Sequence, residues 1–173
     1  MRQRNIFLVG PMGTGKTAVG AALAARLGRP FHDTDALVVS AAGLDIPALF
    51  QTEGEVRFRL REAAIVRELA AAAGIVGATG GGCVLLEENR RLLKDGNLVV
   101  YLRAGLDNRV ARIGDAEDRP LLPGGDLRAA RKLLDDEREP LYLEVADCTV
   151  NNDGTVEAAV DAVVRAAGLQ PPR

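Results

Sequence analysis

The residues best suited to chemistry lie in one glycine-rich loop near the start of the chain. Residues 10–17 read Gly-Pro-Met-Gly-Thr-Gly-Lys-Thr and fit the pattern G-x-x-x-x-G-K-[ST]. In this pattern, backbone N–H groups cradle phosphate oxygens, the lysine reaches the β- and γ-phosphates, and the final hydroxyl binds Mg²⁺. The loop therefore predicts a nucleoside triphosphate site, with Lys16 as its cation and Thr17 as a metal ligand.

The sequence on both sides of this loop favours the same interpretation. An apolar run at residues 6–9 predicts a buried strand before it, and apolar residues at helical spacing follow between 16 and 27. A strand, a glycine turn and a helix N-terminus together form a concave anion site. Lysine is also rare here, occurring only at Lys16, Lys94 and Lys132. A glycine turn without a ligand is the alternative, and the context argues against it.

Two carboxylates follow the second predicted strand. The segment 31–35 reads Phe-His-Asp-Thr-Asp, and side chains two residues apart share one side of an extended backbone. One carboxylate could serve Mg²⁺ while the other accepts a hydrogen bond from a substrate hydroxyl. The predicted strands 75–78 and 98–102 do not end in Asp, so Asp33 is the metal candidate. The alternative is that Asp35 caps a helix and Asp33 is simply solvated.

A second cluster combines a charged pair with a run of glycines. Arg59 and Glu62 are three residues apart and share a helix face, so Glu62 could hold the guanidinium in position. A solvated charged face is the alternative. After the predicted strand at 75–78 come Gly80, Gly81 and Gly82. Three glycines suit close approach of the backbone to a ligand.

Two arginines complete the set of candidates. Arg119 lies in the polar, then Pro/Gly-rich segment 114–125, which is either a mobile lid or a plain surface connection. Arg138 begins the sequence Arg-Glu-Pro-Leu-Tyr. Because almost every basic residue of this chain is arginine, each carries little information by itself.

The elements that must position these residues alternate along the chain. Strands are predicted at 5–9, near 31, at 75–78, 98–102 and 148–150, and helices at 16–27, 56–73, 87–94, 106–113, 127–146 and 155–167. We expect Pro140 to break or kink the helix that contains it. The alternation predicts an α/β fold with a parallel sheet covered by helices on both faces. In such sheets, ligands bind at the carboxyl ends of the strands.

Composition limits the function classes. The chain has 173 residues, enough for one domain spanning 1–173, and a formal net charge of −2. This balance gives no broad positive field, so extended nucleic-acid binding is not expected. No apolar run approaches the length of a membrane span. The two cysteines, Cys83 and Cys148, match no metal spacing and predict reduced thiols, so we expect a cytoplasmic protein.

The order of these motifs resembles the shikimate kinase family over nearly the whole chain. The family pattern of P-loop, D-T-D, G-E-x-x-F-R-x-x-E, G-G-G, R-P-L-L and R-x-P-L-Y occurs here at 10–17, 33–35, 54–62, 80–82, 119–122 and 138–142. The resemblance implies a three-layer P-loop kinase fold with a five-stranded parallel sheet, a substrate-binding subregion at about 33–62 and a lid at about 114–125. It implies ATP- and Mg²⁺-dependent phosphorylation of the 3-hydroxyl of shikimate in aromatic amino-acid biosynthesis.

The resemblance also implies roles for individual residues. ATP contacts are expected at Gly13, Thr14, Gly15, Lys16, Thr17, Ala18, Arg112 and Arg119. Acceptor contacts are expected at Asp35, Arg59, Glu62, Gly80, Gly81, Gly82 and Arg138. Thr17 and Asp33 correspond to the Mg²⁺ contacts, Arg112 to an arginine that stacks on adenine, and Lys16, Asp35 and Arg119 to the catalytic groups. A monomer is the expected state.

One departure and two alternatives accompany this interpretation. The loop 151–154 carries no cation, whereas some family members place a second basic residue beside the adenine there. Two arginines favour a carboxylate-bearing acceptor, because the planar guanidinium binds carboxylate in a bidentate manner. A gluconate-type sugar-acid kinase is one alternative. A nucleotide switch without small-molecule turnover is the other, although the chain lacks an N/T-K-x-D guanine motif.

Overall fold

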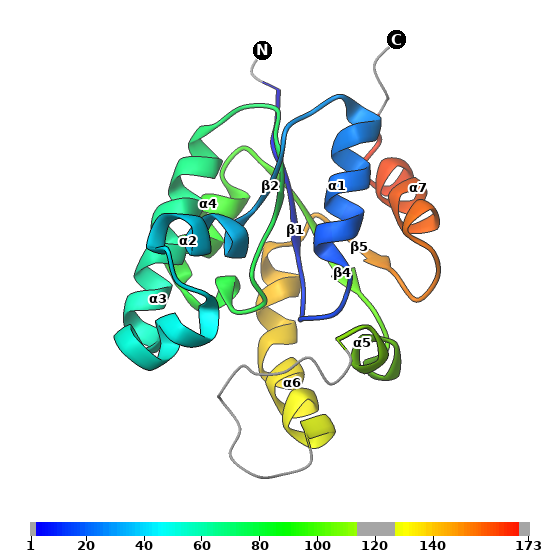
Figure 1. Cartoon of the computed structure of the whole chain (residues 1–173). Coiled ribbons are helices and arrows are strands. Elements are labelled where there is room, and N and C mark those ends of the chain that lie inside the picture. The colour runs from blue at the N-terminus through cyan, green and yellow to red at the C-terminus, as the bar shows by residue number, and fades with distance from the viewer. Residues whose placement is uncertain (1–2, 114–126, 170–173) are drawn as a thin grey trace.

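The computed structural model describes residues 3–113 and 127–169, and its centre is a single parallel sheet (Figure 1). The strands are β1 (Ile6–Val9), β2 (Phe31–Asp33), β3 (Val76–Ala78), β4 (Leu98–Arg103) and β5 (Cys148–Asn151). Their order is β2-β3-β1-β4-β5, and every neighbouring pair is parallel. The predicted five-stranded parallel sheet is confirmed.

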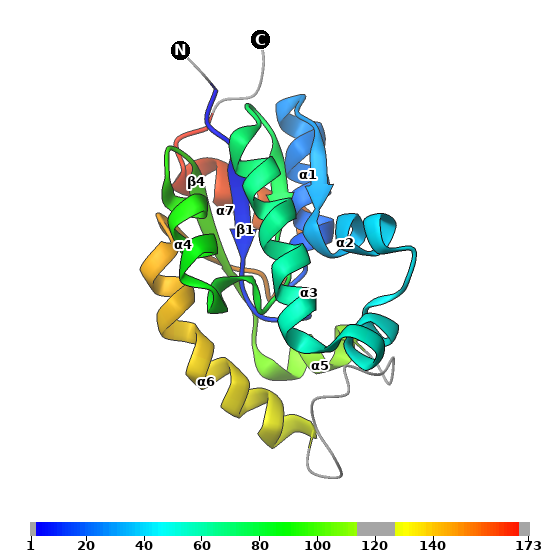
Figure 2. The ribbon, with the colours of Figure 1, turned by 90° about the vertical axis from the view of Figure 1, so that its left-hand side faces the viewer.

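Helices cover both faces of this sheet. They are α1 (Lys16–Leu27), α2 (Thr34–Ala42), α3 (Ile46–Ala71), the 3₁₀ helix η1 (Cys83–Leu85), α4 (Glu87–Lys94), α5 (Leu106–Ile113), α6 (Leu127–Val145) and α7 (Val156–Ala166). Helices α1 and α7 lie on one face, while α3 and α4 lie on the other, in front of β1 in Figure 2. The result is the predicted three-layer α/β fold.

The central strand β1 shows why the sheet needs both helical layers. Ile6 and Leu8 belong to the core shared with α1 and α7, whereas Phe7 and Val9 belong to the core shared with α3, α4 and α6. Side chains alternate between faces along a strand, so a strand covered on both faces reads as a continuous apolar run. This packing fixes the carboxyl end of β1, from which the glycine-rich loop 10–17 continues.

The helical region after β2 differs from the prediction. Helix α2 was not predicted, and α3 spans Ile46–Ala71 rather than 56–73. The cause is Gly54, whose φ of 78° interrupts the helical geometry within α3 and divided the apolar pattern. The start of α3 is set instead by Asp45, whose side chain accepts a hydrogen bond from the Ala48 N–H at 2.8 Å.

Helix α6 also departs from the expectation in one respect. The expectation was a break or a kink at Pro140; the helix continues through that residue to Val145, so there is no break. Tyr142 and Val145 are buried in the core just beyond the proline. Their packing holds the last turn in place despite the hydrogen bond that a proline cannot donate.

Candidate active site

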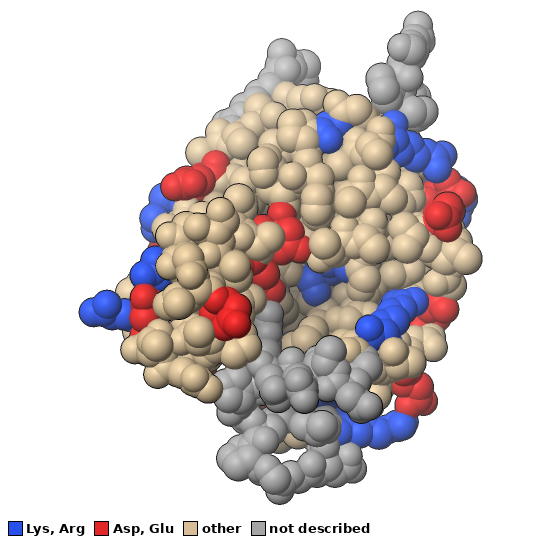
Figure 3. Space-filling view, viewed as in Figure 1, with Lys and Arg blue, Asp and Glu red and all other residues tan. Residues whose placement is uncertain are grey.

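A cavity of about 400 Å³ opens at the carboxyl edge of the sheet. Its lining residues come from the ends of β1, β2 and β3 and from α1, α2 and α5: Met12, Gly13, Gly15, Lys16, Thr17, Ala18, Asp33, Asp35, Thr79, Gly81 and Arg112. Figure 3 shows acidic and basic side chains facing one another across a hollow in this surface. The predicted phosphate-loop residues other than Thr14, which is buried beneath the loop, therefore share one cavity with both predicted carboxylates.

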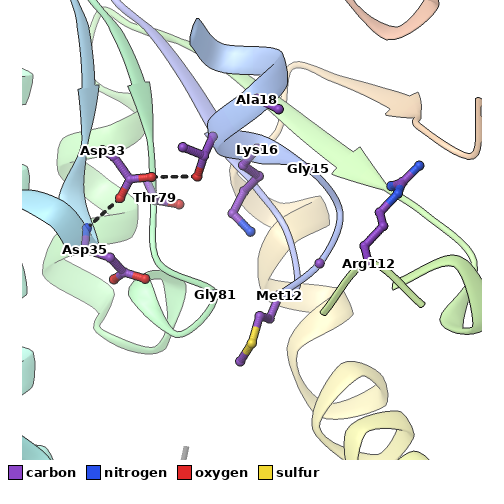
Figure 4. Close-up of a pocket in the computed structure, with 11 residues that line it drawn as sticks. Met12, Gly15, Lys16, Ala18, Asp33, Asp35, Thr79, Gly81 and Arg112 are labelled. Atoms are coloured by element: carbon purple, nitrogen blue, oxygen red, sulfur yellow. Dashed lines mark hydrogen bonds between the residues drawn. The ribbon is translucent and has the colours of Figure 1, made fainter. Parts of the chain in front are cut away.

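The glycine-rich loop has the backbone that a phosphate cradle requires. Gly13 and Gly15 have φ angles of 80° and 88°, a region that side chains with a Cβ rarely adopt. Lys16 begins α1, and its Nζ donates to the Gly10 and Pro11 carbonyl oxygens, each at 2.7 Å. The lysine ammonium thus lies within the curl of its own loop, beside the helix N-terminus (Figure 4).

Thr17 and Asp33 meet at the inner wall of the cavity. The Thr17 hydroxyl donates to Asp33 Oδ2 at 2.7 Å, while Asp33 Oδ1 accepts from the Asp35 N–H at 2.9 Å and so caps α2 (Figure 4). The helix cap is therefore Asp33, not Asp35. Both side chains offer the oxygen ligands that Mg²⁺ prefers. In the described part of the chain, no group of three or more His, Cys, Asp and Glu forms a metal site. A shared site completed by phosphate oxygens fits these residues best.

The glycine run approaches the carboxylates closely. A Cβ atom on Gly80 would lie 2.5 Å from Asp35 Oδ1 and 2.7 Å from Glu62 Oε1. The Gly80 N–H also donates to the Thr34 hydroxyl at 3.0 Å, which joins β3 to the start of α2. These contacts place the Gly81 backbone in the cavity wall and Asp35 beside it.

Arg59 and Glu62 form the predicted pair, and it is buried. Arg59 Nη1 donates to Glu62 Oε2 at 2.8 Å; Arg59 is 8% exposed and Glu62 0%. Burial alone would lower the pKa of Arg59, but Glu62 and Glu55 outweigh it and raise that pKa. A Cβ on Gly82 would lie 2.2 Å from Arg59 Nη2. The solvated charged face is thus excluded for Arg59, whose guanidinium lies against the glycine run although it does not line the main cavity.

Arg138 also lies outside the main cavity. It lines a neighbouring cavity of about 60 Å³, which shares Met12 with the first. One turn further along α6, the Tyr142 hydroxyl donates to the Gly81 carbonyl at 2.5 Å. Helix α6 is therefore fastened to the glycine run just beyond Arg138.

Arg112 lines the opposite end of the main cavity, as Figure 4 shows. Its Nη2 donates to the backbone carbonyl of Asn152 at 2.6 Å, and the Asn152 side-chain amide donates to the Thr14 carbonyl at 2.8 Å. The loop 151–154, which has no cation, thus bonds both the P-loop and Arg112. Arg119 and the predicted lid at 114–125 lie outside the described residues.

Comparison with known proteins assigns the chain to a family. The family model described as Shikimate kinase matches residues 12–167. The chain belongs to the shikimate kinase family. A shikimate kinase of Chromobacterium violaceum is 48% identical over 85% of this chain and 80% of its own length. A shikimate kinase of Legionella pneumophila is 42% identical over 95% of each.

Solved structures agree with this assignment to the shikimate kinase family. The shikimate kinase from Acinetobacter baumannii in complex with shikimate has a TM-score of 0.90 and 40% identity, covering 94% of this chain and 92% of that one. A gluconokinase from Sinorhizobium meliloti has a TM-score of 0.56 at 16% identity, covering 95% and 91% respectively. The gluconokinase shares the fold alone, so the sugar-acid kinase alternative gains no further support from it.

Met12 and Thr79 line the cavity but were not singled out in the sequence. Three residues that support its walls were also missed. Thr34 was taken only as part of D-T-D, Tyr142 only as part of R-x-P-L-Y, and Asn152 only as part of a loop without a cation. Their structural roles depend on contacts with distant residues, and no local pattern reports such contacts.

Within the described residues, no helix is both long and apolar enough to span a membrane.

Proposed function

We propose that this chain transfers the γ-phosphoryl group of ATP to the 3-hydroxyl of shikimate, giving shikimate 3-phosphate and ADP. The observation that carries the proposal is one cavity lined by phosphate-binding and acceptor-type residues together, in a chain of the shikimate kinase family. Phosphoryl transfer leaves the protein little covalent chemistry, so positioning and charge neutralisation dominate.

The nucleotide would occupy the P-loop end of the cavity. Backbone N–H groups at Gly13–Ala18, with Lys16, would bind the phosphates, and Lys16 would exchange its carbonyl partners for phosphate oxygens. Thr17 and Asp33 would hold Mg²⁺, which when bound neutralises charge on the β- and γ-phosphates. Arg112 would stack on the adenine, held there by the Asn152 carbonyl.

The acceptor would lie against α2 and the glycine run. Asp35 would accept a hydrogen bond from the attacking hydroxyl and orient it towards the phosphate. Arg59, held by Glu62, and Arg138 would bind the carboxylate of shikimate, while backbone groups at Gly80–Gly82 would contact its ring hydroxyls. This division of roles is supported by the wall that Asp35 and Gly81 share with the phosphate cradle.

Arg119 enters the proposal through the sequence alone, since it lies outside the described residues. An arginine that neutralises charge on the transferring group can contribute about 10³–10⁵ in kcat. We therefore expect Arg119→Ala to lower kcat far more than it weakens ATP or shikimate binding, in steady-state assays with both substrates varied. A variant that lost only ATP affinity would make Arg119 a nucleotide anchor.

A coupled assay of ADP release with ATP, Mg²⁺ and shikimate tests the function directly. Gluconate in place of shikimate is the matched control, and phosphorus NMR of the product identifies the phosphorylated hydroxyl. We expect turnover with shikimate and little with gluconate. Equal turnover of the two acids, or none with shikimate, would contradict the proposal. We also expect activity from a monomer, which light scattering of the active protein would check.

A further inference from the structure

One face of α6 carries three residues that connect separate parts of the site. Asp135, Arg138 and Tyr142 are spaced three and four residues apart and therefore share a helix face. Tyr142 binds the Gly81 carbonyl at 2.5 Å, on the acceptor side. Asp135 pairs with Arg109 of α5. Arg138, the proposed carboxylate ligand, lies between these two attachments.

Arg109 reaches from α5 to the tip of the P-loop. Its Nη1 donates to Asp135 Oδ1 at 3.1 Å and, at 3.5 Å, to the Met12 carbonyl, while its Nη2 bonds the second oxygen of Asp135. The backbone of the same residue packs on the loop, since a Cβ on Gly13 would lie 2.9 Å from the Arg109 carbonyl oxygen. Arg109 is only 7% exposed and the Asp135 side chain 23%, so the pair is largely shielded from water. A bidentate, buried guanidinium is a directional link, because its planar fork fixes both partners.

We propose that Arg109 is a positioning residue that sets the P-loop tip and α6 in register, so that one buried ion pair aligns the nucleotide site with Arg138. This inference rests on the proposed function. When phosphates order the P-loop, Met12 and Arg109 are fixed with it, and Asp135 then fixes the turn of α6 that bears Arg138. The link works in both directions, because coupling between two binding sites is reciprocal.

The chain offers a matched control between the same two helices. Arg128 Nη1 and Asp107 Oδ1 also join α6 to α5, at 2.5 Å, but their side chains are 61% and 75% exposed. Exposed ion pairs contribute little, since water and salt screen them. If joining α5 to α6 were sufficient, loss of either pair would reduce the coupling between nucleotide and shikimate binding equally. If the contact of Arg109 with the P-loop is required, only loss of the buried pair will reduce this coupling.

Two sets of variants separate these cases. Arg109→Met combined with Asp135→Leu removes the buried pair without leaving an unpaired charge. Arg109→Lys keeps the charge but loses the fork. Arg128→Ala combined with Asp107→Ala removes the exposed pair. For each protein, calorimetry gives the shikimate dissociation constant with and without a non-hydrolysable ATP analogue and Mg²⁺. Steady-state assays give kcat and both KM values, and thermal unfolding confirms folding.

In the parent protein, we expect the analogue to tighten shikimate binding by about 5- to 150-fold, the usual range of coupling between sites. In the buried-pair variant, the ratio of the shikimate dissociation constants without and with the analogue should fall close to one, while the affinity for the analogue stays near the parent value. The ratio for Arg109→Lys should lie between those of the parent and the buried-pair variant. The exposed-pair variant should have the ratio of the parent. The inference is overturned by a parent ratio of one, by a ratio retained without the buried pair, or by equal loss in the control. If the double variant does not fold, Arg109→Lys decides by the same ratio. Failure to turn over shikimate at all would refute the proposed function instead.

Discussion

The phosphate half and the acceptor half of the candidate site are built in different ways. The phosphate half is local: residues 10–18 are contiguous, and Lys16 bonds carbonyl groups only five and six positions earlier. The acceptor half is assembled from distant parts of the chain. Asp35 comes from α2, Arg59 from α3, and Arg138 from α6, with the glycine run after β3 between them.

The two halves therefore fail in different ways. The phosphate half depends on backbone conformation and one cation, so a single change of charge should abolish its chemistry while the fold persists. The acceptor half depends on packing, because the Arg59–Glu62 pair is buried against Gly82 without a contiguous scaffold. Small changes of shape there should weaken acceptor binding even where no contacting side chain is altered.

The largest expected effect is that of Lys16→Met in the phosphate half. The substitution keeps the length of the side chain and removes the charge that faces the β- and γ-phosphates. We expect phosphoryl transfer to fall by a factor of hundreds or more, on the order of 3 kcal/mol or above. The coupled assay measures it, with circular dichroism as the check on folding. A kcat near the parent value would mean that the nucleotide lies elsewhere.

Arginine-to-lysine changes test the acceptor half without altering charge. Arg59→Lys and Arg138→Lys each lose the bidentate fork, so each should weaken shikimate binding by about 1.5–3 kcal/mol and leave ATP binding nearly unchanged. Titration of each ligand separately gives the comparison. Arg26→Lys, on an exposed ion pair with Asp161, is the matched control. Unchanged shikimate affinity in both test variants would place the carboxylate site elsewhere.

Gly82→Ala tests packing alone. The φ of Gly82 is −93°, so alanine fits the backbone, but its Cβ would lie 2.2 Å from Arg59 Nη2 and must displace it. We expect Gly82→Ala to lower either the free energy of shikimate binding or the free energy of unfolding by about 1–3 kcal/mol, the usual cost of overpacking. Gly154→Ala is the control, because a Cβ there meets no atom within 4 Å. Equal behaviour of the two variants in calorimetry would show that the close approach has no consequence.

Much of the fold and the phosphate half could be predicted because their signals are local. The apolar runs gave all five strands, and the spacing of residues 10–17 identified a cradle whose φ angles depend on those same residues. The helices of the acceptor half, α2 and α3, were harder to predict from the sequence. Gly54 interrupts α3, so its first turns did not show a continuous period. Helix α2 was missed; the alternative weighed there placed a helix cap at Asp35, whereas the capping side chain is that of Asp33.

The supporting contacts of the site could not be predicted for a different reason. Arg109 is one of many arginines, and nothing nearby in the sequence indicates its pairing with Asp135, 26 positions away. Thr34 and Gly80 are 46 positions apart, and Tyr142 and Gly81 are 61. These pairs form only when the fold brings α2, the glycine run after β3, α5 and α6 together. Tertiary contacts of single residues leave no periodic pattern in the chain.

The smallest expected effect is that of Tyr142→Phe, which tests how α6 is fastened to the glycine run. The change removes the hydrogen bond to the Gly81 carbonyl and the contact of the hydroxyl with Arg138. It should cost about 0.5–1.5 kcal/mol of stability, with a modest rise in KM for shikimate. Tyr101→Phe is the control. The Tyr101 ring stacks on that of Tyr142, with ring centroids 5.1 Å apart, so the change removes a neighbouring hydroxyl but leaves the bond to Gly81 in place. A Tyr101→Phe variant that loses as much would argue against a specific role for the Tyr142 bond.

The difference in stability between the parent protein and Tyr142→Phe should depend on pH, and this dependence supplies a second check. Burial raises the pKa of the Tyr142 hydroxyl above its ordinary value of 10.0. The donor therefore stays protonated near neutral pH, and the gap in stability between parent and Tyr142→Phe should be constant there. Above about pH 10 the unfolded chain loses the phenolic proton first, which favours unfolding of the parent. The gap should then narrow as the pH rises through that range in thermal unfolding scans. A gap that widened with pH would mean that the folded protein stabilises the phenolate, and the bond to Gly81 would not be the reason for the loss.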